Sequence, residues 1–393
     1  MSLRLLPAAL LLSIVAAVAW AAPDSGTIRV AIVDNARSAE LSGDLVVSEV
    51  GGCCAPQSWR ADAVRAVVAN GGVEIDGRRA SGFRLTSSRP IRLNGREYDG
   101  RLDVFKNGDV GLVVVNELPL EDYLVGVLRA ESSERWPAEA LRAQAIASRT
   151  YAAYHRQLNA ARPYHIVAST AHQQFVGRVA AASPAWGAVQ ETAGQVMYWE
   201  GELFPAFYHA NSGGYTEDPR TVFAGRGQPA LRPVVCQLAA GAPNFQWSLE
   251  LRLDDLSELL RRGGVGVGSV RSIEVIERST SLRAGAVIVR GSARTQRLRG
   301  SDFRRVIGYD TLKSTLFAVA VDGEVARFSG RGHGHGVGMC QWGAKSMAEL
   351  GASARQILTF YYPGATLSTL DTRKGASPDS EGGFAPLPTF VAR

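Results

Sequence analysis

The chain has 393 residues, of which 46% are hydrophobic and 20% charged, so it can bury a sizeable core in one large or two ordinary domains. Its 43 Lys and Arg residues against 37 Asp and Glu residues give a formal net charge of +6, and the basic residues are scattered. No block of Lys and Arg of the kind that marks a nucleic-acid-binding arm occurs, so we expect no nucleic acid as a partner.

The first residues have the pattern of a secretory signal peptide. Arg4 precedes an apolar run from Leu5 to Val18, and Ala19-Trp20-Ala21 offers a small-residue cleavage site. The run is short for a membrane span, although an uncleaved anchor stays an alternative. We therefore expect a signal peptide at residues 1–21 and an exported, mostly soluble mature protein in the periplasm or cell envelope.

The cysteine content is low for a disulfide framework in a chain of this length. The four cysteines are Cys53, Cys54, Cys236 and Cys340. Export makes a disulfide possible, but the spacing leaves the pairing open, and adjacent Cys53 and Cys54 could bond each other only with local strain. No CxxC spacing is present, which argues against a zinc site. We expect no bound metal and no cofactor.

Residues 22–115 are expected to form a β-rich N-terminal region. Short β candidates are separated by Gly-rich turns, and they lie at Thr27–Asp34, Leu45–Val50, Ala63–Val68 and Gly82–Thr86. Two further β runs, Arg101–Phe105 and Val110–Val115, flank Asn107-Gly108. Asn-Gly between two β runs is a strong hairpin signal.

The pattern changes to helix after Pro119, which we place at the first helical position. A first helix is expected over Leu120–Ala130 and a second from Pro137 to about His155, with a kink between them. Further elements are expected as a hairpin of 195–199 with 203–209, strands at 247–253, 270–276 and 286–289, and helices at 253–262, 339–350 and 354–361. The fold class expected is α+β: a mixed β-rich N-terminal region packed on a helical core, with further strands, a Gly-rich loop and a disordered tail from about Asp371.

The stretch Gly332–Gly343 reads GHGHGVGMCQWG and combines five glycines with two histidines and a Gln-Trp pair. Such a run suits close approach of the backbone to a ligand or to another segment. A glycine-rich turn with solvated or core histidines is the plainer interpretation. The polar cluster from Glu131 to Tyr151, over which this loop could close, favours a functional site.

Glu131 stands at the end of the first predicted helix. A carboxylate against an apolar wall can have a raised pKa, which suits a general acid, whereas a solvated helix-end glutamate is the alternative. Glu134 and Glu139 are rivals, and Glu139 in a first helical turn would interact favourably with the helix dipole. Arg149 could hold a sugar carboxylate or pair with Glu131. No GxSxG, HExxH, Walker or CxxC pattern occurs, so serine hydrolases, zincins and nucleotide-binding proteins lose support.

Several blocks resemble the family of stage II sporulation protein D and the amidase enhancer LytB. In chain order they are Val115–Val127, Trp136–Tyr151 with Glu131 before it, Gln174–Gly177, Tyr208–Glu217 and Gly334–Ala344, closing on Tyr361–Gly364. The resemblance covers nearly all of residues 27–368, and the ordered blocks together are far more specific than any one of them.

This resemblance implies a lytic transglycosylase that cleaves peptidoglycan glycan strands between MurNAc and GlcNAc, with formation of 1,6-anhydro-MurNAc ends, in cell-wall remodelling. It places the single acid/base on Glu131. The substrate-binding positions that it implies are Arg149, His209, Ser212, Tyr215, His335, Gln341 and Trp342. It divides the chain into the signal peptide at 1–21, the β-rich region at 22–115, a SpoIID-like catalytic core at 116–370 and a flexible tail at 371–393. Glycan strands are the implied partner, and a cell-wall amidase is a further candidate.

The chain also departs from the family. Some members bind zinc through His and Cys residues in and after the cleft loop, but Ser212 stands here where those have Cys. Gln173 beside His172 occupies another such place, and Cys236 lacks a CxxC partner. These departures argue against bound zinc.

A single carboxylate suffices in the implied mechanism because the 6-hydroxyl of the muramic acid replaces water. Glu131 would protonate the leaving oxygen and then take the proton of that hydroxyl. Two other classes stay open: a non-catalytic peptidoglycan-binding module that enhances an amidase, and a metal-dependent hydrolase that uses His209, His333 and His335. The catalytic interpretation requires that Glu131 lie within about 15 Å of the 331–343 loop. It also requires that the N-terminal region pack on the helices.

Overall fold

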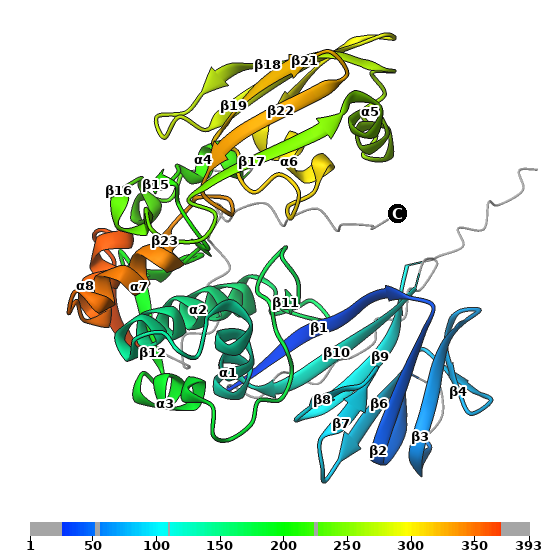
Figure 1. The fold of residues 1–393 in the computed structure, drawn as a ribbon. Helices are drawn as coiled ribbons and strands as arrows, with labels where there is room; N and C mark the ends of the chain where they lie inside the picture. The colour runs from blue at the N-terminus through cyan, green and yellow to red at the C-terminus, as the bar shows by residue number, and fades with distance from the viewer. Residues whose placement is uncertain (1–25, 52–55, 109–110, 224–226, 371–393) are drawn as a thin grey trace, which may run out of the picture.

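The computed structural model of the chain describes residues 26–51, 56–108, 111–223 and 227–370. The expected signal peptide, Cys53, Cys54 and the expected tail lie outside the described residues. The fold is α+β, as expected (Figure 1). None of the helices in the described ranges is both long and apolar enough to cross a membrane.

An 11-stranded sheet contains the strands of the N-terminal part, drawn in blue and cyan in Figure 1, and one short strand from beyond α2, β11, drawn in green. Its main path is β11-β1-β10-β9-β6-β2-β3-β4-β5, in which β11 joins β1 in parallel and the other neighbours are antiparallel. The pairing of β9 with β10 confirms the hairpin expected around Asn107-Gly108. The strands are β1 (Thr27–Ala36), β2 (Ser38–Val50), β3 (Ser58–Ala69), β4 (Gly72–Ile75), β5 (Arg78–Ala80), β6 (Gly82–Ser87), β7 (Ile91–Leu93), β8 (Arg96–Tyr98), β9 (Arg101–Asn107), β10 (Gly111–Pro119) and β11 (Ile166–Val167).

Three helices follow β10 in the chain: α1 (Leu120–Glu131), α2 (Ala138–Leu158) and, after β11, α3 (Pro184–Glu191). One buried hydrophobic cluster contains Val30 and Val114 of the sheet together with Tyr123 of α1 and Tyr151 of α2. The N-terminal region therefore packs on the helices, as predicted. Pro119 is the N-cap of α1 rather than its first residue, because β10 continues as far as Pro119.

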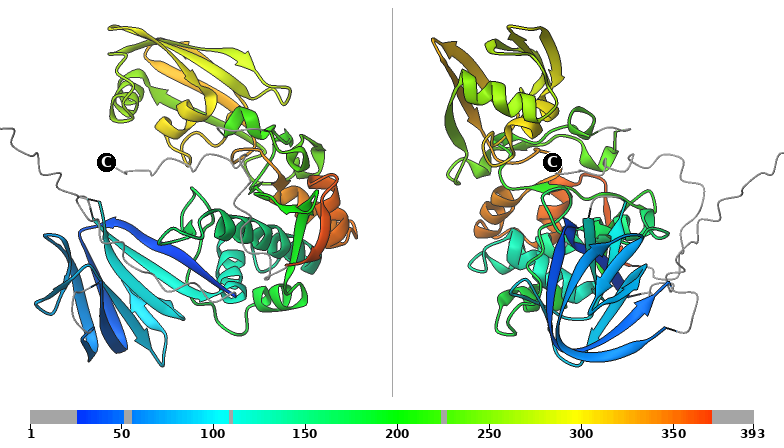
Figure 2. Two further views of the ribbon diagram at one scale, coloured as in Figure 1. Left: turned by 180° about the vertical axis from the view of Figure 1, so that it is seen from behind. Right: turned by 90° about the vertical axis from the view of Figure 1, so that its right-hand side faces the viewer.

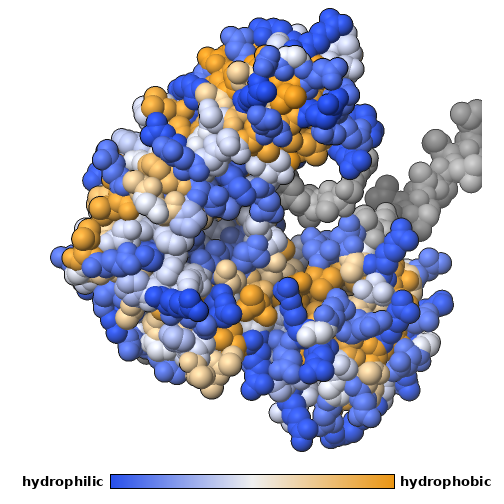
Figure 3. Space-filling view, in the orientation of Figure 1, coloured by the Kyte–Doolittle hydropathy of each residue, from blue (hydrophilic) through white to orange (hydrophobic). Residues whose placement is uncertain are grey.

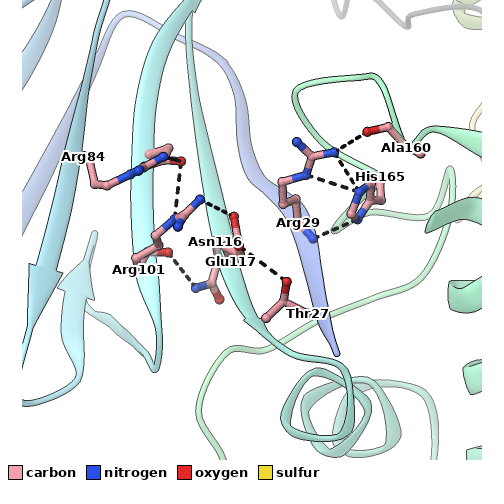
Figure 4. A network of polar contacts seen from close by, with 9 residues as sticks. Thr27, Arg29, Arg84, Arg101, Asn116, Glu117, Ala160 and His165 are labelled. Carbon is pink, nitrogen blue, oxygen red and sulfur yellow. Dashed lines mark hydrogen bonds and ion pairs between the residues drawn. The ribbon is translucent and has the colours of Figure 1, made fainter. Parts of the chain in front are cut away.

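A buried polar network ties the sheet to the chain that follows α2 (Figure 4). Arg29 of β1 bonds His165 through its backbone N–H and its guanidinium, and it also donates to the carbonyl of Ala160. Glu117, close to the start of α1, accepts from Arg101 at 2.6 Å. Burial, followed by the positive charge of Arg29, lowers the pKa of His165 to about 3, so this histidine is a neutral structural partner.

The middle of the molecule is built from short strands and helices around a second cluster, which includes Met339, Cys340 and Tyr361. The strands are β12 (Gln195–Trp199), β13 (Glu202–Leu203), β14 (Tyr208–His209), β15 (Gly214–Tyr215), β16 (Val235–Cys236), β23 (Met339–Cys340) and β24 (Thr366–Thr369). The helices are α4 (Pro219–Val222), α7 (Gln341–Glu349) and α8 (Ala354–Tyr361), with 3-10 turns at Pro229–Leu231 and Gln237–Ala239.

The second predicted hairpin is shorter than expected. β13 pairs with β12 at Leu203 and Glu202 only, and β14 instead pairs in parallel with β23. Pro205 lies between β13 and β14, and a proline cannot donate to a strand ladder. This break sends Tyr208 and His209 to the glycine loop, where the candidate site is built.

Residues 246–331 form a separate unit with their own hydrophobic cluster, which includes Leu256, Val287, Phe303 and Phe328. Figures 1 and 2 show this unit standing apart from the N-terminal sheet, and Figure 3 shows a hollow between the two with hydrophilic residues along its back. The elements of the unit are β17 (Gln246–Arg252), α5 (Leu253–Arg262), β18 (Val270–Arg278), β19 (Ala284–Gly291), β20 (Thr295–Arg299), α6 (Gly300–Ile307), β21 (Phe317–Asp322) and β22 (Val325–Arg331).

Candidate active site

Glu131 is the last residue of α1, and two chain segments from elsewhere in the sequence converge on it. The backbone N–H of Gln174 donates to Oε1 at 2.8 Å. The Nε2 of Gln341 donates to the Glu131 backbone carbonyl at 3.2 Å and lies 3.5 Å from Oε2. Glu131 and the 331–343 loop are therefore in direct contact, which confirms the proximity that the sequence analysis required.

Buried tyrosines and Gln173 hold the segment that presents Gln174. The amide of Gln173 is fully buried, accepts from the Tyr123 hydroxyl at 3.0 Å, and donates to the Tyr208 hydroxyl at 3.0 Å and the Ser148 carbonyl at 3.2 Å. Since the Gln173 side chain is anchored on three sides, the next backbone N–H points at the Glu131 carboxylate. The amide thus acts as a fixed support.

The other support comes from the glycine loop and α7. β14 and β23 pair at His209 and Cys340, and the chain then enters α7, of which Gln341 is the first residue. Trp342 packs edge-on against Trp136, with ring centroids 5.3 Å apart. Both indoles are partly exposed, so they offer an aromatic surface close to the end of α1.

The glycine loop approaches another backbone closely, one of the two possibilities that its composition suggested. A Cβ atom on Gly338, whose φ is +71°, would lie 2.0 Å from the carbonyl oxygen of Phe207. Glycine is therefore needed here to let β23 reach β14.

Burial dominates the electrostatics of Glu131. Removal of water raises the pKa of the Glu131 carboxyl, and the hydrogen bonds from Gln174 and Gln341 counteract this only in part. Burial and then the charge of Glu131 raise the pKa of Tyr208. A carboxyl with a raised pKa that keeps two donors can hold a proton and also accept one, as acid/base catalysis requires.

The rival glutamates are engaged elsewhere. Glu139 forms an ion pair with Arg142 and accepts from the backbone N–H of Ala354 at the start of α8. Glu134 accepts from Ser183 and lies 3.5 Å from Arg129.

Arg149 was expected to bind substrate or to pair with Glu131, but the structure gives it another partner. Its side chain is fully buried and makes a two-pronged ion pair with Glu121 at 2.9 and 2.6 Å. It also donates to the carbonyls of Val189 and Gln195. With these partners the guanidinium holds α1, α2 and α3 together, and it does not reach a surface that a glycan could contact.

The remaining candidates lie on β14, on the loop and strand β15 that follow it, and on the glycine loop. Nδ1 of His209 is 3.1 Å from the Val337 carbonyl, while its Nε2 is buried without a partner. The ring of His335 lies 5.5 Å from that of His209. Ser212 is fully buried, and its hydroxyl donates to the Cys236 carbonyl, so it supports the loop and is not open to a ligand. Tyr215, in β15, is partly exposed and pairs through its backbone with Val235.

Arg283 was not foreseen from the sequence. This fully buried side chain from the 246–331 unit donates to the Ser212 carbonyl at 2.6 Å, while its Nε and Nη1 have no partner. Its guanidinium lies against Gly336, where a Cβ atom would be 2.6 Å from Cζ. Arg283 lies in the turn between β18 and β19, and a lone arginine there carries no sequence signal for such a role.

The histidines do not assemble as the metal-dependent alternative requires. Within the part of the chain that the structure describes, no three or more His, Cys, Asp or Glu side chains are grouped so that they could hold a metal ion. Burial lowers the pKa of His335 to about 3, and also lowers that of His209.

Comparisons with known proteins agree with the family resemblance. A family model described as stage II sporulation protein matches residues 109–199, which include Glu131, and a model described as a domain of unknown function (DUF8618) matches residues 238–338. An uncharacterized protein of Brachyspira hyodysenteriae is 34% identical over 276 residues, covering 70% of this chain and 73% of that protein. A stage II sporulation protein D of Bacillus amyloliquefaciens is 28% identical over 70% of this chain and 84% of its own length. An amidase enhancer of Bacillus subtilis is 29% identical over 72% of this chain and 46% of its own length.

Proposed function

Because the chain belongs to the stage II sporulation protein D (SpoIID) family, we propose that it is an exported lytic transglycosylase. The proposed reaction cleaves peptidoglycan glycan strands between MurNAc and GlcNAc and leaves 1,6-anhydro-MurNAc ends. The observation that supports this proposal most is the Glu131 carboxyl, which has a raised pKa and two fixed donors at the meeting point of α1, residues 173–174 and α7.

The proposed mechanism needs one proton carrier. Glu131 first gives its proton to the glycosidic oxygen while positive charge develops on the sugar. The resulting carboxylate then removes the proton of the MurNAc 6-hydroxyl, which attacks the anomeric carbon and closes the anhydro ring. The Gln174 N–H and the Gln341 amide stabilise the carboxylate between the two steps, since both can donate to it.

Glycan positioning is proposed for residues beside Glu131. Trp342, together with Trp136, provides an aromatic surface on which a sugar ring can stack, and Gln341 fixes the direction of the carboxylate. His335 and Tyr215 are partly exposed and lie farther along the same loops, and we propose them as the outer contacts of the glycan, whereas the buried His209 supports the loop.

The direct test is Glu131→Gln, assayed by mass analysis of fragments released from purified peptidoglycan. Glutamine keeps the shape but cannot cycle a proton, so anhydro-muramyl products should fall roughly a hundredfold or more. Glu134→Gln and Glu139→Gln are matched controls whose carboxylates have other partners, and they should retain most of the activity. Release at the wild-type rate by Glu131→Gln would reject the catalytic assignment.

A second candidate is a non-catalytic peptidoglycan-binding module that enhances a cell-wall amidase. It is supported by the similarity to a protein named amidase enhancer. For such a module, Glu131→Gln should leave both glycan binding and amidase stimulation intact. A wild-type protein that stimulates an amidase but releases no anhydro-muramyl ends would favour this candidate.

A further inference from the structure

Two cysteines far apart in the sequence lie in the same buried cluster of the middle region. Cys236 is the last residue of β16, and Cys340 ends β23 and is the N-cap of α7. Their exposed fractions are 2% and 0%, and both are free thiols in this structure. Neither thiol has a part in the proposed mechanism.

The two sulfur atoms lie against the same glycine. Sγ of Cys340 accepts from the backbone N–H of Gly343 at 3.3 Å, and a Cβ atom on Gly343 would lie 2.6 Å from Sγ of Cys236. Ser212 also joins the pair, because its N–H donates to the Cys340 sulfur and its hydroxyl donates to the Cys236 carbonyl. This placement leaves the thiols within reach of each other.

The electrostatics indicate that the two sulfurs interact directly in the folded chain. A hydrogen bond from the Cys340 thiol lowers the pKa of Cys236. Burial, and then the contact with Cys236, raises the pKa of Cys340. The two sulfurs therefore face each other once the cluster has closed.

We propose that Cys236 and Cys340 form a disulfide in the exported protein. The proposal rests on the export that forms part of the proposed function, and it is independent of the catalytic step. One S–S bond forms, two protons leave the thiols, and two electrons reduce a disulfide of the exporting compartment's oxidant to two thiols. Because both sulfurs are buried in the folded chain, this exchange takes place during folding, before the cluster closes.

The bond would stabilise the segments that support the candidate site. It would close a loop of about 100 residues that contains the 246–331 unit, and long loops give the largest entropic stabilisation of a disulfide. It would also join the segment after β15 to the first turn of α7, which carries Gln341. A covalent bond would then fix the distance between Gln341, which donates to the Glu131 carboxylate, and the loop that contains Ser212.

The test uses the full chain with Cys53→Ser and Cys54→Ser, which leaves two cysteines. The protein is exported into an oxidising compartment, denatured, alkylated without reductant and mapped by mass spectrometry. We expect a peptide pair that joins Cys236 to Cys340 and two alkylatable thiols only after reduction. The bond should raise the melting temperature by roughly 5 °C relative to the reduced protein. Cys236→Ser in the same background is the control, and Cys340 should then be alkylated without reduction.

If the chain is not exported, refolding of the purified chain in a glutathione redox buffer decides the question. Two free thiols after either treatment would overturn the proposal, as would stoichiometric zinc that is lost when either cysteine is changed. Linkage of Cys236 or Cys340 to Cys53 or Cys54 in the unaltered chain would also reject it. The Glu131→Gln protein should form the same bond, so a failure of the catalytic proposal does not affect this result.

Discussion

Tyr208 and His209 are neighbours in β14, and they belong to two polar regions of opposite character. Side chains of adjacent strand residues point to opposite faces. The Tyr208 hydroxyl bonds Gln173 on the side of Glu131, whereas His209 lies against Val337 and His335 on the other side. The strand therefore separates a region built around one carboxylate from a region built around histidines and Arg283.

The same physical cause acts in opposite directions on the two sides. Burial favours the neutral form of a group, so it raises the pKa of Glu131 but lowers the pKa of His335 to about 3 and of Arg283 to about 10. Near neutral pH the histidines are uncharged. The carboxyl whose pKa is raised thus lies on one side of β14, while the histidines on the other side support the loops through packing and hydrogen bonds.

The largest effect is expected where a fully buried side chain with several partners is removed. Arg149→Met deletes the two-pronged ion pair with the half-exposed Glu121 and leaves the Val189 and Gln195 carbonyls without this donor, so a loss of about 3–4 kcal/mol of unfolding free energy is expected. Arg283→Met, the matched control, removes one hydrogen bond and two unpaired N–H groups, so about 1 kcal/mol is expected. Urea unfolding of both variants measures the difference. An equal or larger cost for Arg283→Met would mean that Arg283 has partners, such as bound water, that compensate its charge.

The close approach of the chain before β23 to the chain before β14 should be almost as sensitive to substitution. Gly338→Ala drives a methyl group into the Phe207 carbonyl at 2.0 Å, and we expect a loss of about 2–4 kcal/mol and reduced glycan release. Gly351→Ala is the control, since it has a similarly positive φ of +90° but open space around the added Cβ, and about 1 kcal/mol is expected. Thermal unfolding distinguishes them, and equal losses would show that the conformational strain, and not the close approach, is decisive.

A smaller effect is expected when one donor to the carboxylate is removed. Gln341→Ala should reduce release of anhydro-muramyl products roughly tenfold, because Glu131 keeps the Gln174 N–H but loses its second donor. Since the Gln341 hydrogen bond lowers the pKa of Glu131, its loss should move the alkaline limb of the pH–rate profile to higher pH. Glu349→Gln, at the other end of α7, is the control. An unchanged pH profile together with unchanged rate would show that Gln341 does not act on the carboxylate.

Much of this arrangement could be predicted from local sequence patterns. The periodicity between Leu120 and His155 predicted α1 and α2 to within a few residues, and the Asn107-Gly108 turn predicted the hairpin of β9 and β10. The order of the family blocks predicted that Glu131 meets the glycine loop, and the Gln341 contact confirms this. These features depend on neighbours in sequence or on a motif that is present as a whole.

The parts that could not be predicted depend on long-range packing. Arg149 pairs with Glu121 of another helix rather than with Glu131, and helical spacing alone cannot choose between the two carboxylates. The donor at Gln174 is a backbone N–H, whose direction is set by the anchoring of Gln173 and not by the identity of residue 174. The placement of Cys236 and Cys340 in one cluster likewise depends on two pairings, β14 with β23 and β15 with β16, which no local pattern marks.

The smallest expected effect sharpens the contrast between Glu131, whose carboxyl pKa is raised by burial, and Glu134, whose carboxylate is paired. The folded-state pKa of Glu131 is raised, so its contribution to stability is present below the unfolded pKa and is lost as the pH rises through the folded pKa. Glu131→Gln should therefore melt close to the wild type at about pH 4 and slightly above it at about pH 8. Glu134→Gln, which loses charge-assisted contacts with Ser183 and Arg129, should show no such gain. Melting temperatures across this pH range provide the measurement, and a wild type that is the more stable protein at the alkaline end would show that Gln174 and Gln341 outweigh burial at Glu131.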